Sequence, residues 1–196
     1  MSNVEGNMGQ ATKGKTTSDG RERLIDAARG LFLRRGAANV GINKVTETAG
    51  VARMTLYNNF PSKEALTEAV YNEMAADTLA LLEQASSNCE TEASRVEAIF
   101  AFYESRTKKP HYRGCPFIHA SLQEAEPRGA IYDIVQRYKR GLRDHIRNSL
   151  EGTRSRRAEL ADQIVLLLDG AVTESYLRGV SSPMTAARNA ATVLLC

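Results

Sequence analysis

The 196-residue chain contains no tryptophan, only three cysteines and no long run of apolar residues. The apolar stretch at residues 164–168 is far shorter than the roughly 18 residues that a membrane-spanning helix needs. The first 15 residues also lack the apolar segment of a secretory signal. We therefore expect a cytoplasmic protein.

The few residues with metal or redox chemistry show no arrangement typical of a metal or disulfide site. The cysteines are odd in number, and their spacing fits neither a disulfide framework nor a zinc site: Cys89, Cys115 and Cys196. The three histidines have no metal-ligand spacing among themselves or with the cysteines. Neither a nucleophile with a recognisable base nor a phosphate-binding glycine loop is present. We expect reduced thiols, no metal, no cofactor and no enzymatic activity.

The composition is that of a folded globular protein, with 42% hydrophobic and 25% charged residues. The net charge is only +3, but it is unevenly distributed. Residues 1–63 carry ten basic and five acidic side chains, whereas the remainder carries 16 basic and 18 acidic ones. The first third is therefore the part that a polyanion would attract, although a solvated basic surface explains the same pattern.

The N-terminal third is predicted to begin with a flexible arm at residues 1–18, which lack aromatic side chains and have little to bury. Asp19 and Glu22 have the spacing of a capping box, and helical periodicity follows over residues 20–35. Two arginines and then Gly36 suit the end of this helix.

Two short helices are predicted next, at residues 42–49 and 52–59, with Gly50 in the turn between them. Ser62 has the position of an N-cap for a long helix that extends to about residue 84. Five more helical patterns follow, separated by glycine- and proline-containing breaks: 93–108, 115–126, 130–150, 156–179 and 184–195. We expect an all-α fold of about nine helices.

The two short helices form a candidate helix-turn-helix. Their apolar residues have spacings that let the helices cross closely: Val45, Ala49, Val51 and Leu56. The remaining surface of the second helix carries side chains suited to bases and phosphates: Arg53, Met54, Thr55, Tyr57, Asn58 and Asn59. Lys63 adds a cation near the start of the following helix. This pattern predicts binding to double-stranded DNA.

Residues 21–70 resemble the tetracycline-repressor (TetR) family. The resemblance rests on Arg35-Gly36 at the end of the first helix, on Ala49-Gly50-Val51, and on the string Thr55-Leu-Tyr-Asn-Asn-Phe-Pro-Ser-Lys-Glu-Ala-Leu66. The chain departs from the family pattern at Gly41, Thr46 and Ala52. The resemblance implies a DNA-binding domain at 19–66 and an effector-binding and dimerisation domain at 67–196.

The resemblance also implies residue roles. It places eight side chains near the bases or phosphates of DNA: Asn43, Lys44, Arg53, Met54, Thr55, Tyr57, Asn59 and Lys63. The alternative is that Met54 and Tyr57 only pack against neighbouring helices and that Arg53 is a solvated cation.

The last two helices are the expected homodimer contact. The resemblance implies that they pair with their symmetry mates through Leu160, Ile164, Leu167, Leu168, Ala171, Met184, Ala187, Ala190, Ala191 and Leu194. The alternative is that both helices are buried in the core of their own subunit.

Aromatic and polar residues of the larger domain suggest an effector pocket. The candidates are Phe100, Tyr103, Phe117, His119, Tyr132, Asp169, Thr173 and Tyr176. Asp169 interrupts an apolar helix face, so pairing with an arginine of its own fold is an alternative role. Cys115 opens a predicted helix, where a lowered pKa would suit redox sensing, but a buried core cysteine is the alternative.

Together these features predict a ligand-responsive transcriptional regulator. A repressor that binds a palindromic operator as a homodimer and is released by a small-molecule effector fits them best. The alternative is an effector-independent DNA-binding or architectural protein that acts through a protein partner.

Overall fold

The computed structural model describes the backbone of residues 12–123 and 129–196, and the side chains of residues 19–123 and 129–196. Within these ranges the chain forms helices and no strand, which confirms the all-α prediction. The elements are α1 Thr12–Arg35, a 3-10 turn Ala37–Asn39, α2 Ile42–Ala49, α3 Arg53–Asn59, α4 Lys63–Ser86, α5 Glu92–Thr107, α6 Pro116–Gln123, α7 Ala130–Ser149, α8 Arg154–Arg178 and α9 Ser182–Leu195.

The predicted start of the first helix is wrong. α1 begins at Thr12, so Asp19 lies inside the helix and instead approaches Arg23 at 3.9 Å. Gly20 also lies inside α1, where a Cβ atom would be 3.0 Å from Cγ2 of Thr55, so α1 packs closely against α3 at this residue. Residues 1–11 of the predicted arm lie outside the described residues.

The ends of the helices in the helix-turn-helix agree with the predictions. Gly50 adopts the left-handed conformation at φ 62° and ψ 39°, and Gly36 has a positive φ of 78°. The Ser62 hydroxyl accepts a 3.1 Å hydrogen bond from the backbone N–H of Ala65 and so caps α4. Gly41 and Ala52 occupy the N-cap positions of α2 and α3 without a side-chain hydrogen bond. The family-like helices are therefore present although two common caps are replaced.

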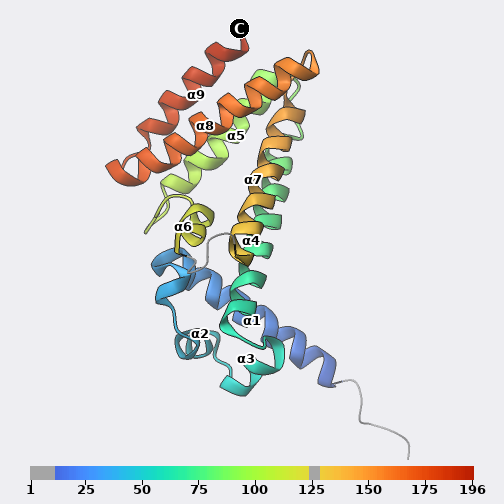
Figure 1. The fold of residues 1–196 in the computed structure, drawn as a ribbon, viewed down its shortest axis with the longest axis vertical. Helices are drawn as coiled ribbons and strands as arrows, with labels where there is room; N and C mark the ends of the chain where they lie inside the picture. Colours follow the sequence, from blue (N-terminus) through green and yellow to red (C-terminus); the bar gives the residue numbers. More distant parts are fainter. Residues whose placement is uncertain (1–11, 124–128) are drawn as a thin grey trace, which may run out of the picture.

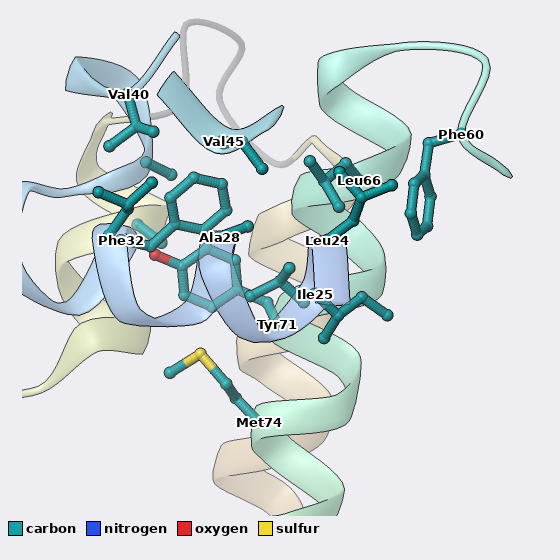
Figure 2. Packing of buried hydrophobic residues seen from close by; sticks show 14 of the residues in the cluster. Leu24, Ile25, Ala28, Phe32, Val40, Val45, Phe60, Leu66, Tyr71 and Met74 are labelled. Atoms are coloured by element: carbon teal, nitrogen blue, oxygen red, sulfur yellow. The ribbon is translucent and has the colours of Figure 1, made fainter. Parts of the chain in front are cut away.

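Two hydrophobic cores lie along the elongated molecule (Figure 1). The first joins α1, α2, α3 and the beginning of α4, and it also takes in residues of α6 and α7. Figure 2 shows Leu24, Ala28 and Phe32 of α1 close to Leu66 and Tyr71 of α4. The second core joins α5, α8, α9 and the C-terminal part of α7.

Helix α4 contributes to both cores. Leu66, Val70 and Tyr71 belong to the first, and Leu82 belongs to the second. With 24 residues, α4 is about 36 Å long at the helical rise of 1.5 Å per residue. One continuous helix therefore connects α3 with the larger domain.

The last two helices turn most of their predicted dimer contacts into the core of their own chain. Seven of the ten residues are at most 8% exposed: Leu160, Ile164, Leu168, Ala171, Met184, Ala187 and Ala191. Leu167 is half-buried, and Ala190 and Leu194 are exposed. The outward surface instead carries Leu166, Leu177 and Val193, which are 72%, 68% and 73% exposed. For these seven residues the structure supports the alternative of burial in the core of their own subunit, and the dimer contact itself stays a prediction.

Replacing Leu66 with alanine should lower the free energy of unfolding by about 3 kcal/mol, since this fully buried side chain joins α4 to the first core. Urea denaturation followed by far-ultraviolet circular dichroism, at one fixed protein concentration, measures the change. The control is Leu122→Ala on α6, where the side chain is 79% exposed and the loss should stay below about 0.5 kcal/mol. Equal losses in the two variants would contradict the assignment of Leu66 to the core.

Candidate functional site

Helix α3 is held by one buried side chain and exposes most of the others. Leu56 is fully buried, whereas Met54 and Tyr57 are 69% and 41% exposed. Arg53 and Asn58 are also exposed. We call these four exposed residues the outer face of α3: Arg53, Met54, Tyr57 and Asn58. The interpretation that Met54 and Tyr57 only pack against neighbouring helices does not fit this exposure.

Two other candidate DNA-contact residues on α3 are turned toward the protein and not toward solvent. Thr55 is half-buried, and its methyl group lies against the backbone of Gly20 in α1. Asn59 is half-buried and donates a 2.8 Å hydrogen bond from Nδ2 to the carbonyl oxygen of Thr55. These contacts occupy the two side chains within the protein, so the geometry favours the outer face over Thr55 and Asn59 for base contacts.

Arg53 and Tyr57 form a pair on the outer face. Nη2 of Arg53 donates a 3.3 Å hydrogen bond to the Tyr57 hydroxyl, and the guanidinium carbon lies 5.6 Å from the centre of the ring. Among the described side chains, no carboxylate forms an ion pair with Arg53. The guanidinium charge is therefore held in place by a neutral partner and stays available to a nucleic acid.

The candidates outside α3 border it on both sides. Asn43 on α2 is exposed, whereas Lys44 forms a 3.0 Å ion pair with Glu47 on the same helix. Lys63 is the first residue of α4, and its Nζ lies 3.4 Å from the carbonyl oxygen of Ala38. Among the described side chains Lys63 forms no ion pair, although its charge acts on the neighbouring Glu64, whereas Glu47 offsets the charge of Lys44.

The helix-turn-helix is tied to α1 at its turn. Nη2 of Arg23 donates a 2.9 Å hydrogen bond to the carbonyl oxygen of Gly50. Two arginines of α1 also form ion pairs with α4, Arg21 with Glu73 at 3.0 Å and Arg29 with Asp77 at 2.7 Å. The position of α3 is therefore coupled to α1, and α1 is coupled to α4.

A cavity of about 190 Å³ lies in the larger domain, bounded by residues of α4, α5, α6, α7 and α8. Three of the predicted pocket residues line it: Tyr103, Phe117 and Asp169. Met74 and Thr78 of α4 also line it, as does Leu33 of α1. An occupant of this cavity would therefore touch both helices that hold the helix-turn-helix.

The other five predicted pocket residues do not line this cavity. Phe100 is fully buried in the second core, and Tyr132 is half-buried on α7. The His119 and Tyr176 rings contact each other at 5.9 Å, and Thr173 is exposed with its hydroxyl donating to the backbone oxygen of Asp169. Aromatic clustering in the sequence locates the region of the cavity but not the side of each helix that faces it.

Some polar or charged lining residues were missed as candidates for the site, among them Arg106, Tyr112 and Lys139. Arg106 lies three residues after Tyr103 in α5, a spacing that places both on one side of a helix. That spacing is the signal that would have found it. Lys139 forms the ion pair with Asp169. The predicted ion pair of Asp169 is thus present, with a lysine in place of the expected arginine.

Aromatic rings connect the cavity to the helix-turn-helix. Phe117 stacks on Tyr138 with ring centres 3.9 Å apart, and Tyr71 of α4 contacts Phe117 at 6.0 Å. Tyr71 in turn stacks with Phe32 of α1 at 6.2 Å. Direct ring contacts therefore extend from the cavity wall to α4 and α1.

The tyrosines of the cavity are neutral at physiological pH. The hydroxyl groups of Tyr103 and Tyr138 are 2.7 Å apart, and burial raises the pKa of both above the ordinary tyrosine value. Burial also raises the pKa of Tyr112 to about 12. All three phenols therefore act as hydrogen-bonding groups and not as anions.

Cys115 does not have the low pKa expected of a thiol at a helix N-terminus. Burial raises the pKa of its thiol, and this effect exceeds the opposing effects of the Lys139 charge and of hydrogen bonds from the backbone of Ile118 and Phe117. The thiolate fraction at neutral pH is correspondingly small. Cys115 is half-buried and packs against both cores, which favours the alternative of a core cysteine, and its redox role stays an untested prediction.

None of the described helices is both long and apolar enough to cross a membrane.

Comparison with known proteins places these features in a family. The family profile described as "Bacterial regulatory proteins, tetR family" matches residues 24–70. The HTH-type transcriptional regulator Rv1255c of Mycobacterium tuberculosis, itself uncharacterized, is 46% identical over 48 residues, which are 24% of each chain. The match therefore covers about a quarter of the length of this curated relative.

Solved structures extend the similarity to the whole fold. SCO4454, a TetR-family transcriptional regulator from Streptomyces coelicolor, superimposes with a TM-score of 0.82 at 23% identity, covering 91% of this chain and 95% of that one. A TetR-type regulator from Streptomyces avermitilis, sav143, gives a TM-score of 0.73 at 25% identity over 88% and 97% of the two chains. Residues 24–70 therefore carry the DNA-binding helix-turn-helix of the TetR family, and the chain as a whole has the fold of TetR-family transcriptional regulators.

Proposed function

We propose that this protein is a cytoplasmic repressor that binds a palindromic DNA operator as a homodimer and releases it when a small molecule enters the cavity. The outer face of α3 carries the proposal, because it displays hydrogen-bonding and apolar side chains to solvent on a helix fixed by Leu56. A helix displayed in this way fits the major groove of DNA.

The side chains divide by chemistry into base and phosphate contacts. Arg53 suits a bidentate contact with guanine, Asn58 suits adenine, and Met54 suits the methyl group of thymine. Tyr57 and Lys63 suit phosphate oxygens, and Asn43 on the exposed side of α2 is a further phosphate contact. Lys44, Thr55 and Asn59 have partners within the protein and contribute less in this proposal.

A homodimer follows from the limited reach of one helix. α3 has only seven residues, too few to specify a long site, and two such helices in successive major grooves double the length of DNA contacted. The outward surface of α8 and α9 suits the second copy, because it carries the exposed Leu166, Leu177 and Val193 together with the small Gly170 and Ala190. Small residues let helices approach closely, and apolar ones gain from burial.

Release by an effector would act through α4. The cavity is lined by Met74 and Thr78 of α4, and the same helix carries Glu73 and Asp77, which hold α1. A ligand that favours one position of α4 would shift the population of protein toward that position. Two operator-bound α3 helices cannot both stay in their grooves if their separation changes.

Selection of bound sequences from a random DNA pool tests the function as a whole. A palindromic consensus, followed by release with a compound that also raises the melting temperature, would support a ligand-responsive regulator. A consensus that no cavity-binding compound affects would favour the effector-independent alternative. Recovery of no sequence preference would overturn specific operator binding.

Replacing Arg53 with alanine should weaken operator binding by about 1–3 kcal/mol and relax the preference at one base pair, because a bidentate base contact is lost. Replacing Lys63 with alanine should instead weaken binding to all sequences alike. It should also reduce the slope of the logarithm of the binding constant against the logarithm of the salt concentration by about one unit. Fluorescence anisotropy with operator and scrambled duplexes over a range of salt concentrations measures both effects.

The matched control for Arg53 is Arg140→Ala, which removes the same charge from an exposed position on α7. It should leave operator affinity and specificity unchanged. If Arg53→Ala affects operator and scrambled DNA equally, the assignment of Arg53 to a base contact is wrong.

Replacing Val193 with glutamate should dissociate the dimer and reduce operator affinity, because a charge would be buried at the proposed contact of α9. Sedimentation equilibrium measures the subunit association, and circular dichroism verifies that the helices are intact. Leu122→Glu, at an exposed position on α6, is the control and should stay dimeric. A dimer of unchanged affinity in the Val193 variant would exclude this surface as the contact.

A further inference from the structure

The cavity is lined by more positively than negatively charged side chains, and not all of the positive ones have an acidic partner. Three cations line it, Arg106, Lys109 and Lys139, whereas Asp169 is the single carboxylate among the lining residues that the structure describes. Asp169 is already paired with Lys139. Two positive charges, those of Arg106 and Lys109, therefore lie at the cavity without an acidic partner from its walls.

Arg106 is the more confined of these two cations. It is half-buried, and its guanidinium carbon lies 4.3 Å from the centre of the Phe102 ring. Among the described side chains no carboxylate pairs with it, since Glu104 of the same helix pairs with Lys108 and lies 3.9 Å from Arg188. Its charge acts on the cavity, because it opposes the larger effect of burial on the pKa of Tyr103, Tyr138 and Tyr112.

The tyrosine pair supplies a further hydrogen-bond donor. One hydroxyl of the Tyr103–Tyr138 pair donates to the other, with the two oxygens 2.7 Å apart, so this hydrogen bond uses the proton of only one of the two hydroxyls. The hydroxyl that accepts this bond keeps its own proton. That proton can be donated to an acceptor atom of a ligand next to the pair.

The rest of the cavity limits the size and polarity of the occupant. Phe117, Tyr138, Met74 and Val172 provide a mostly apolar lining. Its volume of about 190 Å³ is somewhat larger than the roughly 150 Å³ of an apolar cavity known to accept benzene. One aromatic ring with one small substituent therefore fits it.

We infer that the cavity binds a small aromatic carboxylate, with its ring against Phe117 and Tyr138 and its carboxylate held by Arg106 and the tyrosine hydroxyl pair. This inference rests on the proposed effector site and assigns its ligand class. Arg106 would form a charge-assisted hydrogen bond with the carboxylate, and Lys109 would add attraction at the exposed edge.

Other ligand classes fit these walls less well. A cationic ligand would meet Arg106 and Lys109, and Asp169 is already occupied by Lys139. A thiol-reactive ligand would depend on Cys115, whose raised pKa leaves little thiolate at neutral pH. The arrangement therefore discriminates by charge and not by covalent reaction.

Isothermal titration calorimetry with three probes of similar size tests the inference on the full chain. The probes are sodium benzoate, benzyl alcohol and benzylamine, which differ mainly in charge. Benzoate should bind at least about tenfold more tightly than the alcohol, since only benzoate gains the charge-assisted bond. Benzylamine should not bind measurably.

Two variants then locate the charge. Arg106→Gln should weaken benzoate binding by about tenfold or more while leaving benzyl alcohol unaffected. Arg140→Gln, which removes the same charge outside the cavity, should change neither. Unaltered helical content and melting temperature of unliganded Arg106→Gln would show that a loss of binding is not a loss of folding.

Each contrary outcome has a distinct meaning. Binding of benzyl alcohol or benzylamine as tight as that of benzoate, the absence of benzoate binding, or an unchanged affinity in Arg106→Gln would overturn the ligand class. If benzoate binds through Arg106 but does not release a selected operator, the ligand class holds and the proposed release mechanism fails. If no operator is selected from random DNA, regulation of an operator fails whatever benzoate does.

Discussion

The burial of α4 in two separate cores is the constraint on which the rest of the structure depends. Leu66 and Tyr71 hold its N-terminal part among α1, α6 and α7, whereas Leu82 packs with α5 and α8 in the second core. Because the helix is continuous, its two ends cannot move independently by more than bending allows. The helix-turn-helix and the cavity are thus connected by one continuous helix, which packs with the first and lines the second.

The helices near the turn could be predicted closely because their signals are local. Gly50, Ser62 and the periodic apolar residues act over a few positions, and the boundaries of α2 and α3 agree with the prediction to within one residue. The start of α1 could not be predicted in this way. The local signals at Asp19 and Glu22 favour a helix start there, whereas α1 continues through them from Thr12.

The sequence indicated which helices contribute to each candidate site better than it indicated which side of each helix faces that site. Helical periodicity identifies an apolar face, but α8 carries leucines on two faces, so composition does not distinguish the buried Leu168 from the exposed Leu166. The same limit applies to the cavity, which Tyr103 lines, whereas Phe100, one turn earlier, is buried in the second core. Lys139 was missed because its importance lies in its contact with Asp169, a residue of another helix.

The single buried leucine of α3 has an evolutionary consequence. Arg53, Met54, Tyr57 and Asn58 contribute little to the packing of the domain, since Leu56 supplies the fully buried side chain of this helix. Substitutions at these four positions can accumulate without unfolding the protein. A gene duplication could therefore give rise to a paralogue with a changed outer face of α3 on an unchanged hydrophobic core.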